Sequence, residues 1–184
     1  MEKIRILGFA GSLRKGSFNR MLLQAAVKLA PEDVEIEVFD LDGIPPFNQD
    51  YELQPPEKVK EFKEKIKAAD AILIVTPEYN YSVPGVLKNA IDSASRPSGD
   101  NSFKDKPVAV MGASNGMLGT ARAQYHLRQS FVFLDMHPVN KPEVFVTFAK
   151  QKFNENGELT DEQTKTFVRQ LLENLAAWTR RLKQ

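Results

Sequence analysis

The sequence predicts an α/β fold, a five-stranded parallel sheet that is doubly wound by helices on both of its faces. Short β-rich apolar segments alternate along the chain with longer segments in which apolar residues recur every three or four positions. Residues 71–75, Ala-Ile-Leu-Ile-Val, are apolar throughout, which is typical of a strand covered on both faces. No internal repeat, low-complexity tract or linker divides the chain, so residues 1–184 are expected to form a single domain.

Composition and charge exclude several classes of protein. The chain has 25 Lys and Arg against 24 Asp and Glu, a net charge of +1, which gives no general signature of nucleic-acid or membrane-surface binding. It has no cysteine, which excludes disulfides, thiolate metal sites and cysteine nucleophiles. No signal peptide precedes the first strand, and no apolar run reaches the roughly 18 residues of a membrane span. We therefore expect a cytoplasmic protein that binds neither nucleic acid nor membranes.

The first loop of the chain carries a signature of phosphate binding. Residues 4–9 form a predicted buried strand, and the apolar periodicity that begins at Phe18 predicts a helix over residues 18–29. The loop between them offers hydroxyls, an amide, two cations and a flexible backbone, contributed by Ser12, Arg14, Lys15, Gly16, Ser17 and Asn19. Free N–H groups and the positive end of the helix dipole favour a phosphate at such a helix N-terminus. The alternative is a capped helix with solvated cations, but a cap accounts for one hydroxyl and not for the whole set.

The next segments predict a strand, a loop and a second helix. Residues 34–39 alternate apolar residues with glutamates, which indicates a strand at or near the sheet edge. A loop interrupted by Pro and Gly follows over residues 41–50. This loop is either a solvated connection or, as we favour, a segment that packs on a partner subunit near the site. Two prolines then precede a helix over residues 57–69 whose charged face is solvated.

A second polar loop, residues 76–85, follows the apolar strand and reads Thr-Pro-Glu-Tyr-Asn-Tyr-Ser-Val-Pro-Gly. Open α/β sheets bind ligands just beyond the carboxyl ends of central strands. The backbone amides of Glu78, Tyr79 and Asn80 could therefore meet the edge of a planar heterocycle, and the two tyrosines could stack on it. The alternative is a rigid surface turn whose tyrosines pack on the next helix.

The remaining segments continue the alternation of helices and strands. They are a helix over 86–95, a strand over 107–112, a third polar loop over 113–120, a helix over 120–134, a strand over 142–146 and a final helix over 160–182. Right-handed crossovers then give the strand order 2-1-3-4-5, the flavodoxin-like version of the doubly wound fold. In that order the loops after strands one, three and four converge on one rim of the sheet.

Several common catalytic motifs are absent. The glycines of the first loop fit neither G-x-G-x-x-G nor the P-loop, and H-E-x-x-H and G-x-S-x-G do not occur. His126 and His137 have no evident acid or nucleophile partner, so we expect packing or hydrogen-bonding roles for both. No metal site is predicted.

Two ordered motifs resemble those of the NADPH-dependent FMN reductase family. Residues 11–19 read Gly-Ser-Leu-Arg-Lys-Gly-Ser-Phe-Asn, and residues 77–82 and 84–92 read Pro-Glu-Tyr-Asn-Tyr-Ser and Pro-Gly-Val-Leu-Lys-Asn-Ala-Ile-Asp. The resemblance is strongest to bacterial quinone reductases that are also described as chromate reductases and azoreductases. It continues through residues 125–129 and 140–143 and covers most of the chain.

The resemblance implies a bound FMN and assigns residues to it. The phosphate-binding residues are Ser12, Leu13, Arg14, Lys15, Gly16, Ser17, Phe18 and Asn19. The residues around the flavin ring are Pro77, Glu78, Tyr79, Asn80 and Tyr81, with Ser114 and Gly116 on the other rim. The residues expected to contact substrate beside the exposed ring are Tyr79, Tyr81 and Arg96. The chain departs from the family pattern at Ser93, where an aromatic residue is common, and at Thr120, where a second glycine is common.

The implied activity is that of a flavoenzyme. NADPH or NADH gives a hydride to flavin N5 and then leaves. A quinone or a similar acceptor (azo compound, chromate or flavin) binds where the nicotinamide was, which is a ping-pong mechanism. No side chain is needed as a catalytic nucleophile. The family usually forms dimers or dimers of dimers, so we expect a homodimer or homotetramer with contacts from residues 45–50 and from Arg122, Tyr125 and Glu143. The alternatives are an electron carrier or flavin-binding redox sensor without steady turnover, and an interaction protein that retains only the fold.

Overall fold

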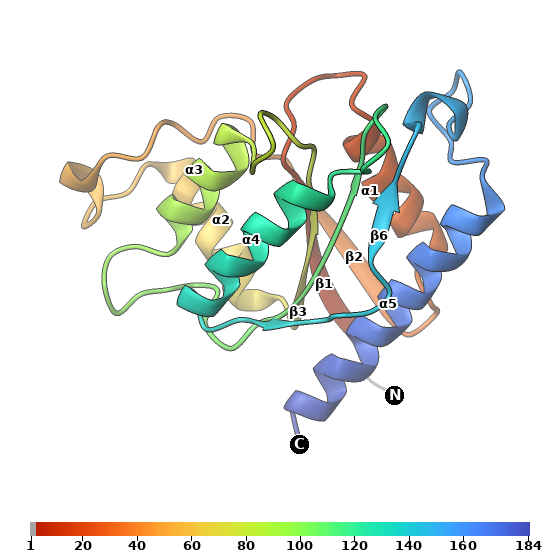
Figure 1. The fold of residues 1–184 in the computed structure, drawn as a ribbon. Coiled ribbons are helices and arrows are strands. Elements are labelled where there is room, and N and C mark those ends of the chain that lie inside the picture. Colours follow the sequence, from red (N-terminus) through yellow and green to blue (C-terminus); the bar gives the residue numbers. More distant parts are fainter. Residues whose placement is uncertain (1–2) are drawn as a thin grey trace.

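The computed structural model describes residues 3–184 as alternating strands and helices (Figure 1). The strands are β1 (Ile4–Ala10), β2 (Val34–Phe39), β3 (Ala71–Val75), β4 (Pro107–Ala113), β5 (His137–Pro138) and β6 (Val144–Val146). The α-helices are α1 (Phe18–Leu29), α2 (Glu57–Ala68), α3 (Gly85–Ala94), α4 (Ala121–Phe133) and α5 (Glu162–Leu182), and two 3-10 turns are η1 (Gln49–Tyr51) and η2 (Ala149–Gln151). Among the helices described within residues 3–184, none is both long and apolar enough to cross a bilayer.

The strands form one parallel sheet in the order β2-β1-β3-β4, with β5 and β6 both paired to the free side of β4. Helices α1 and α5 cover one face of the sheet, and α2, α3 and α4 cover the other (Figure 1). Strand β3 contributes to both cores, because Leu73 and Val75 lie in one and Ile72 and Ile74 in the other. These observations confirm the predicted flavodoxin-like, doubly wound α/β fold.

The fifth position of the sheet differs from the single strand predicted over residues 142–146. Two short strands occupy it: β5 pairs with the start of β4, and β6 pairs with its last three residues, Met111 to Ala113. The predicted fifth strand is thus present as β6, shortened at its start, where Pro142 has no backbone N–H to donate. The additional short strand β5 was not predicted, and its pairing with β4 ends with the bond from the amide of Val139 to Val108 O at 2.8 Å.

A buried lysine holds the segment between α3 and β4. The side chain of Lys63 is 7% exposed, and its Nζ lies 2.7 Å from Asp100 Oδ2 and donates to the backbone carbonyl oxygens of Arg96 and Asp100. Lys67 Nζ lies 2.6 Å from the other carboxylate oxygen of Asp100. Hydrogen bonds from Lys63 and Lys67 hold the pKa of the Asp100 carboxyl below its usual range.

We expect Asp100→Asn to lower the free energy of unfolding near neutral pH. Because the pKa of Asp100 is lowered in the folded state, the contribution of its ion pairs is present above the unfolded pKa and is lost as the pH falls through the folded pKa. The stability difference between the wild type and the variant should therefore shrink below about pH 4. Urea unfolding across this pH range measures it, with Glu155→Gln, an exposed acid without an ion pair among residues 3–184, as the control. A difference that stays constant down to about pH 3 would contradict this account.

Candidate functional site

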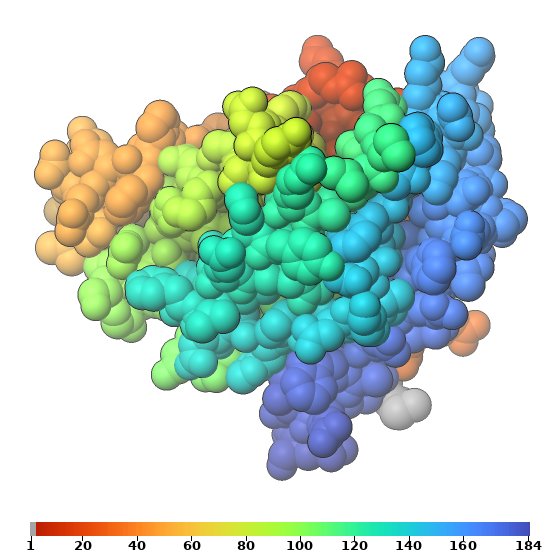
Figure 2. All heavy atoms as spheres, in the orientation of Figure 1, coloured from red at the N-terminus to blue at the C-terminus, as the bar shows by residue number. Residues whose placement is uncertain are grey.

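Three loops that leave the sheet in the same direction form the candidate site. Strands β1, β3 and β4 run parallel and side by side, so the loops that follow them emerge at one edge of the sheet. These loops are residues 11–17, 76–84 and 114–120, which reach the upper edge of the molecule in Figures 1 and 2. The structure thus brings together the three polar loops that the sequence singled out.

The first loop presents free backbone donors at the N-terminus of α1. Ser17 is the N-cap of this helix, and its Oγ accepts hydrogen bonds from the amides of Asn19 and Arg20 at 3.2 and 3.4 Å. Within residues 3–184, the amides of residues 12–16 have no protein acceptor, and the hydroxyl of the buried Ser12 also has no partner. The Ser17 hydroxyl therefore acts as a cap, whereas the remaining donors fit a phosphate group.

The residues of the first loop divide into exposed and anchored groups. The exposed members are Leu13, Arg14, Lys15 and Gly16. Phe18 anchors the end of the loop, since its ring centre lies 5.6 Å from that of Phe153 in the core below. The Arg14 guanidinium carbon is 6.0 Å from the Phe18 ring centre. Both cations of the loop can thus approach a phosphate without disturbing the core.

Asn19 connects the first loop to the third. Its Nδ2 donates to the carbonyl oxygen of Ala113 at 2.9 Å, and its Oδ1 accepts from the amide of Ala113 at 2.8 Å. The residue is buried, so these bonds replace contacts with water. Asn19 therefore holds the N-terminus of α1 against the end of β4 rather than presenting a free amide to a phosphate.

The first loop also packs against the end of β3 and the start of the second loop. The amide of Gly11 donates to the carbonyl oxygen of Val75 at 2.9 Å. A Cβ atom on Gly11 would lie 3.0 Å from Leu87 Cβ and 3.4 Å from Cδ of the buried Pro77. Pro77 is therefore a support beneath the first loop.

The second loop contains a tight turn that projects two tyrosines. Tyr79 and Ser82 exchange backbone hydrogen bonds of 3.2 and 2.9 Å, and Asn80 and Tyr81 between them have φ values of 52° and 61°. Positive φ at both central positions defines a type I′ turn, which asparagine tolerates and a bulky tyrosine rarely adopts. The side chains of Tyr79 and Tyr81 remain 56% and 64% exposed. Of the three amides predicted to meet a ring edge, that of Tyr79 is used in the turn, while those of Glu78 and Asn80 have no acceptor among residues 3–184.

The carboxylate of Glu78 caps α4 and ties this helix to the second loop. Its Oε2 accepts from the amide of Ala123 at 3.1 Å, and its Oε1 lies 3.9 Å from Arg122 Nη1. Arg122 in turn lies over the ring of Tyr81, with Cζ 3.8 Å from the ring centre. The residue at the N-cap position, Thr120, makes no side-chain capping bond, so Glu78 supplies this function from outside the helix.

We expect Glu78→Ala to lower the free energy of unfolding by about 1 kcal/mol, the usual cost of losing a helix cap. Glu78→Gln should cost less, because its amide oxygen can still accept from Ala123. Urea unfolding measures both changes, with Glu61→Ala on the exposed face of α2 as the control. Equal stabilities of Glu78→Ala and the wild type would show that the cap contributes nothing.

The third loop is attached to the segment that follows β6. The amide of Ser114 donates to Val146 O at 3.0 Å, and its carbonyl oxygen accepts from Ala149 at 3.0 Å. The amide of Phe148 donates to Gly116 O at 3.4 Å. A Cβ atom on Gly116 would meet only Ser114 Oγ, at 3.8 Å, so the backbone stays open to a flat ligand. Sequence reasoning missed the supporting segment because no motif marks residues 147–151.

Thr120 is accommodated inside the protein and does not narrow the rim. It is 1% exposed, and its hydroxyl accepts from Gln124 Nε2 at 3.1 Å. Gly112 leaves the space for it, because a Cβ atom there would lie 2.0 Å from Thr120 Oγ1. The φ of Thr120, 71°, is in the region that favours glycine. This agrees with the glycine that is common at position 120 in the family that the sequence resembles.

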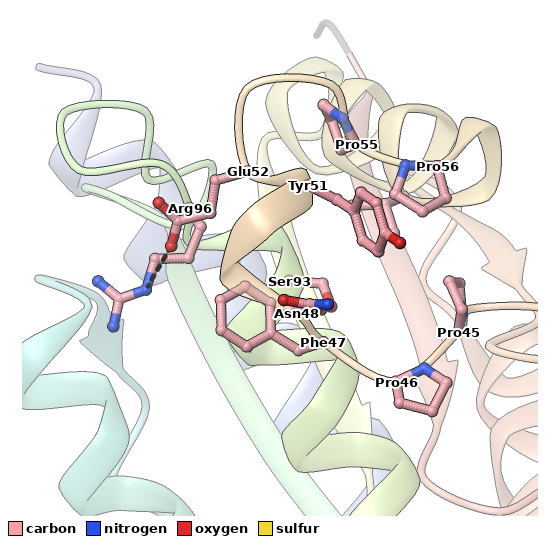
Figure 3. A pocket seen from close by; sticks show the side chains of 11 residues that line it. Pro45, Pro46, Phe47, Asn48, Tyr51, Glu52, Pro55, Pro56, Ser93 and Arg96 are labelled. Atoms are coloured by element: carbon pink, nitrogen blue, oxygen red, sulfur yellow. Dashed lines mark ion pairs between the residues drawn. The ribbon is translucent and has the colours of Figure 1, made fainter.

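The structure does not bring Arg96 together with Tyr79 and Tyr81. Helix α3 starts at the rim and its 10 residues carry the chain about 15 Å away from it before Arg96 is reached. There Arg96 lines a separate depression, with its Nε 3.9 Å from Glu52 Oε1 (Figure 3). The other labelled residues of this depression include Phe47, Tyr51, four prolines and Ser93, where the sequence also departs from the family pattern.

The two histidines have hydrogen-bonding partners at the surface. His126 Nδ1 lies 3.1 Å from Ser82 Oγ, which adds a contact between α4 and the second loop. His137 Nε2 lies 3.4 Å from Asp105 Oδ1 at the opposite end of the sheet. In the part of the chain that the structure describes, no group of three or more His, Asp or Glu residues is arranged to hold a metal ion.

Comparisons with known proteins agree with this geometry. The sequence model of a family described as NADPH-dependent FMN reductase matches residues 4–151, which contain all three loops. An NAD(P)H-dependent FMN reductase from Pseudomonas aeruginosa is 52% identical over 183 residues, 99% of this chain and 98% of the relative. A 2-hydroxy-1,4-benzoquinone reductase from a Burkholderia species is 43% identical over 177 residues, 96% of this chain and 97% of the relative.

A solved structure shares the whole fold. The flavoenzyme FerB from Paracoccus denitrificans, described as an NAD(P)H:(acceptor) oxidoreductase, superposes with a TM-score of 0.89 at 36% identity. The similarity covers 97% of this chain and 98% of FerB. The fold is therefore shared over nearly the full length of both chains.

Proposed function

Because the chain belongs to the NADPH-dependent FMN reductase family and is thus an oxidoreductase with FMN and NAD(P)H as cofactors, we propose that it reduces quinones with NAD(P)H. One observation carries the proposal: the backbone amides of residues 12–16, for which residues 3–184 offer no acceptor, lie with the Ser12 hydroxyl and the Arg14 side chain just before α1. Free amides and a guanidinium are the groups that bind a phosphate such as that of FMN, and the loops after β3 and β4 emerge at the same rim.

The residues of the rim have distinct tasks in this proposal. The first loop binds the phosphate, and the amides of Glu78 and Asn80 donate to the edge of the ring. Tyr79 and Tyr81 shield the exposed side from water and offer a stacking surface to NAD(P)H or acceptor. Asn19 keeps the loops at a fixed spacing.

The reaction balances without a catalytic side chain. NAD(P)H gives up a hydride, which carries two electrons and one proton, and the quinone takes these together with one proton from water to become a hydroquinone. Bound FMN supplies the carrier for this hydride between donor and acceptor. Since the same rim serves both, we propose that donor and acceptor bind in turn, a ping-pong mechanism. Azo compounds, chromate and free flavin are further acceptors in this proposal.

A visible spectrum of the protein with added FMN tests the proposal directly. Anaerobic NADPH should bleach the bound flavin rapidly, and a quinone should restore the oxidised spectrum. Parallel double-reciprocal plots at several quinone concentrations would support alternate binding. Binding without bleaching would indicate an electron carrier or redox sensor, and no binding would overturn the assignment of all three loops.

We expect Arg14→Ala to weaken FMN binding about 10- to 100-fold, the value of a charge-assisted hydrogen bond to a phosphate. Riboflavin, which lacks the phosphate, should bind both proteins equally. Flavin fluorescence quenching measures the two dissociation constants. Arg20→Ala, in the first turn of α1, is a matched control, because Arg20 Nη2 pairs with Asp40 Oδ2 at 2.6 Å. An equal loss for FMN and riboflavin would show that Arg14 acts on the fold rather than on the phosphate.

We also propose that the chain forms a homodimer or homotetramer in the cytoplasm. Tyr125 on the exposed face of α4 donates to Glu143 Oε1 at 2.8 Å, and Lys141 Nζ lies 2.9 Å from Glu143 Oε2. Hydrogen bonds from Lys141 and Tyr125 lower the pKa of Glu143, so its carboxylate stays ionised at neutral pH. With Arg122 and the loop of residues 45–50, it offers contacts to a second copy. Light scattering that finds only a monomer at micromolar concentration would count against the assembly.

A further inference from the structure

An apolar ledge adjoins the candidate site, and the proposed function gives it no role. The ledge consists of Met117, Leu118 and Phe148, which are 77%, 44% and 44% exposed. The first two belong to the third loop, and the amide of Phe148 donates to the carbonyl oxygen of Gly116 at 3.4 Å. The third loop and the segment after β6, which carry the ledge residues, lie side by side at the rim (Figure 1).

Strained backbone holds Phe148 in the ledge. Its φ of 48° and ψ of 46° place it in the left-handed region, where a bulky residue is an outlier. Two bonds to the third loop maintain this conformation, from the amide of Ala149 to Ser114 O and from the amide of Lys150 to Asn115 Oδ1, both at 3.0 Å. Residues with such strained backbone conformations are found preferentially at functional sites.

Tyr81 repeats the same arrangement on the second loop. It is also aromatic, exposed and at positive φ. Strained backbone thus presents two aromatic side chains to solvent at the rim where three loops converge, although burial of either ring would be favourable. Arg122 lies over the Tyr81 ring, yet both aromatic side chains remain exposed, and contact with a bound apolar molecule would remove more of their surface from water.

We propose that the ledge binds the apolar substituent of the electron acceptor. The enzyme would then favour quinones that carry an alkyl or aryl substituent over the unsubstituted ring. The three ledge side chains are uncharged, two of them belong to a rim loop and the third is hydrogen-bonded to that loop through its backbone, so a substituent can lie on them while its quinone ring remains over the site. This inference rests on the proposed function and specifies the acceptor within it.

The test compares 1,4-benzoquinone with a decyl-substituted benzoquinone as acceptors for NADPH oxidation. Phe148→Asn removes the ring but keeps a residue that tolerates the left-handed backbone. We expect kcat/KM for the decyl compound to fall about tenfold more than kcat/KM for benzoquinone, the effect of losing one aromatic contact. Met117→Ser should shift the ratio in the same direction. Phe133→Asn, at an exposed phenylalanine at the far end of α4, is the matched control and should leave the ratio unchanged.

The other outcomes overturn the inference in distinguishable ways. Equal changes in kcat/KM for both quinones would show that the ledge has no role in selectivity. Weaker FMN binding by Phe148→Asn would place the ring in the cofactor site, and a changed mass in light scattering would assign the ledge to a second copy of the chain. Failure of the wild type to oxidise NADPH with either quinone would instead refute the proposed function itself.

Discussion

Gly112→Ala should destabilise the protein by about 3 kcal/mol or more, because the new methyl group has no space. A Cβ atom at this position would lie 2.0 Å from Thr120 Oγ1 and 2.3 Å from the carbonyl oxygen of Thr76. The first atom can move away with its side chain, but the second belongs to the backbone that leads into the second loop. The substitution should therefore force the second and third loops apart and weaken FMN binding as well.

Thermal unfolding and FMN titration measure both effects. For a chain of this size the melting temperature should fall by about 6–12 °C. Gly85→Ala is the matched control, because nothing lies within 4 Å of its added Cβ, and it should be neutral or slightly stabilising. Adding Thr120→Gly to Gly112→Ala should restore only part of the loss, since the Thr76 carbonyl remains in the way. If the melting temperature of the Gly112→Ala protein lay within about 1 °C of that of the wild type, this would contradict the close packing described.

Asn19→Ala should cost about 2–4 kcal/mol, because it leaves both backbone groups of Ala113 without their partner in a buried environment. Asn19→Asp should be similarly unstable: its carboxylate can accept from the Ala113 amide but repels the Ala113 carbonyl oxygen. Urea unfolding measures these losses, with the exposed Asn156→Ala as the control. FMN affinity should fall in parallel, because the N-terminus of α1 is no longer held against β4. Normal stability of Asn19→Asp would show that the two bonds contribute little.

Local sequence patterns predict most of the fold. The bounds of the five helices and of the first four strands follow from apolar periodicity, and they agree with the structure apart from shifts of one or two residues at their ends. The strand predicted over residues 142–146 is found over Val144–Val146, but the short strand β5 was not predicted, because the two residues His137 and Pro138 carry no apolar pattern.

The candidate site is predictable only in part. The three loops and their convergence follow from strand order, because polar loops after parallel strands meet at one rim. The partners of Asn19 and Glu78 do not follow, since each bonds to backbone amides of a segment distant in the sequence. The position of Arg96 likewise depends on the direction of α3, and not on the motif that precedes it.

The order of synthesis gives the final helix a particular importance. Every residue assigned to the cofactor lies before residue 117, whereas α5 begins at Glu162. Leu171, Leu172 and Leu175 of α5 are fully buried in the same core as Leu22 of α1, so the helix that carries the phosphate loop is seated on the last helix of the fold. A nascent chain that has emerged only as far as residue 151 contains the complete binding motif but not the surface that positions it. We therefore expect the nascent chain to acquire flavin only after α5 has been translated and has packed against α1.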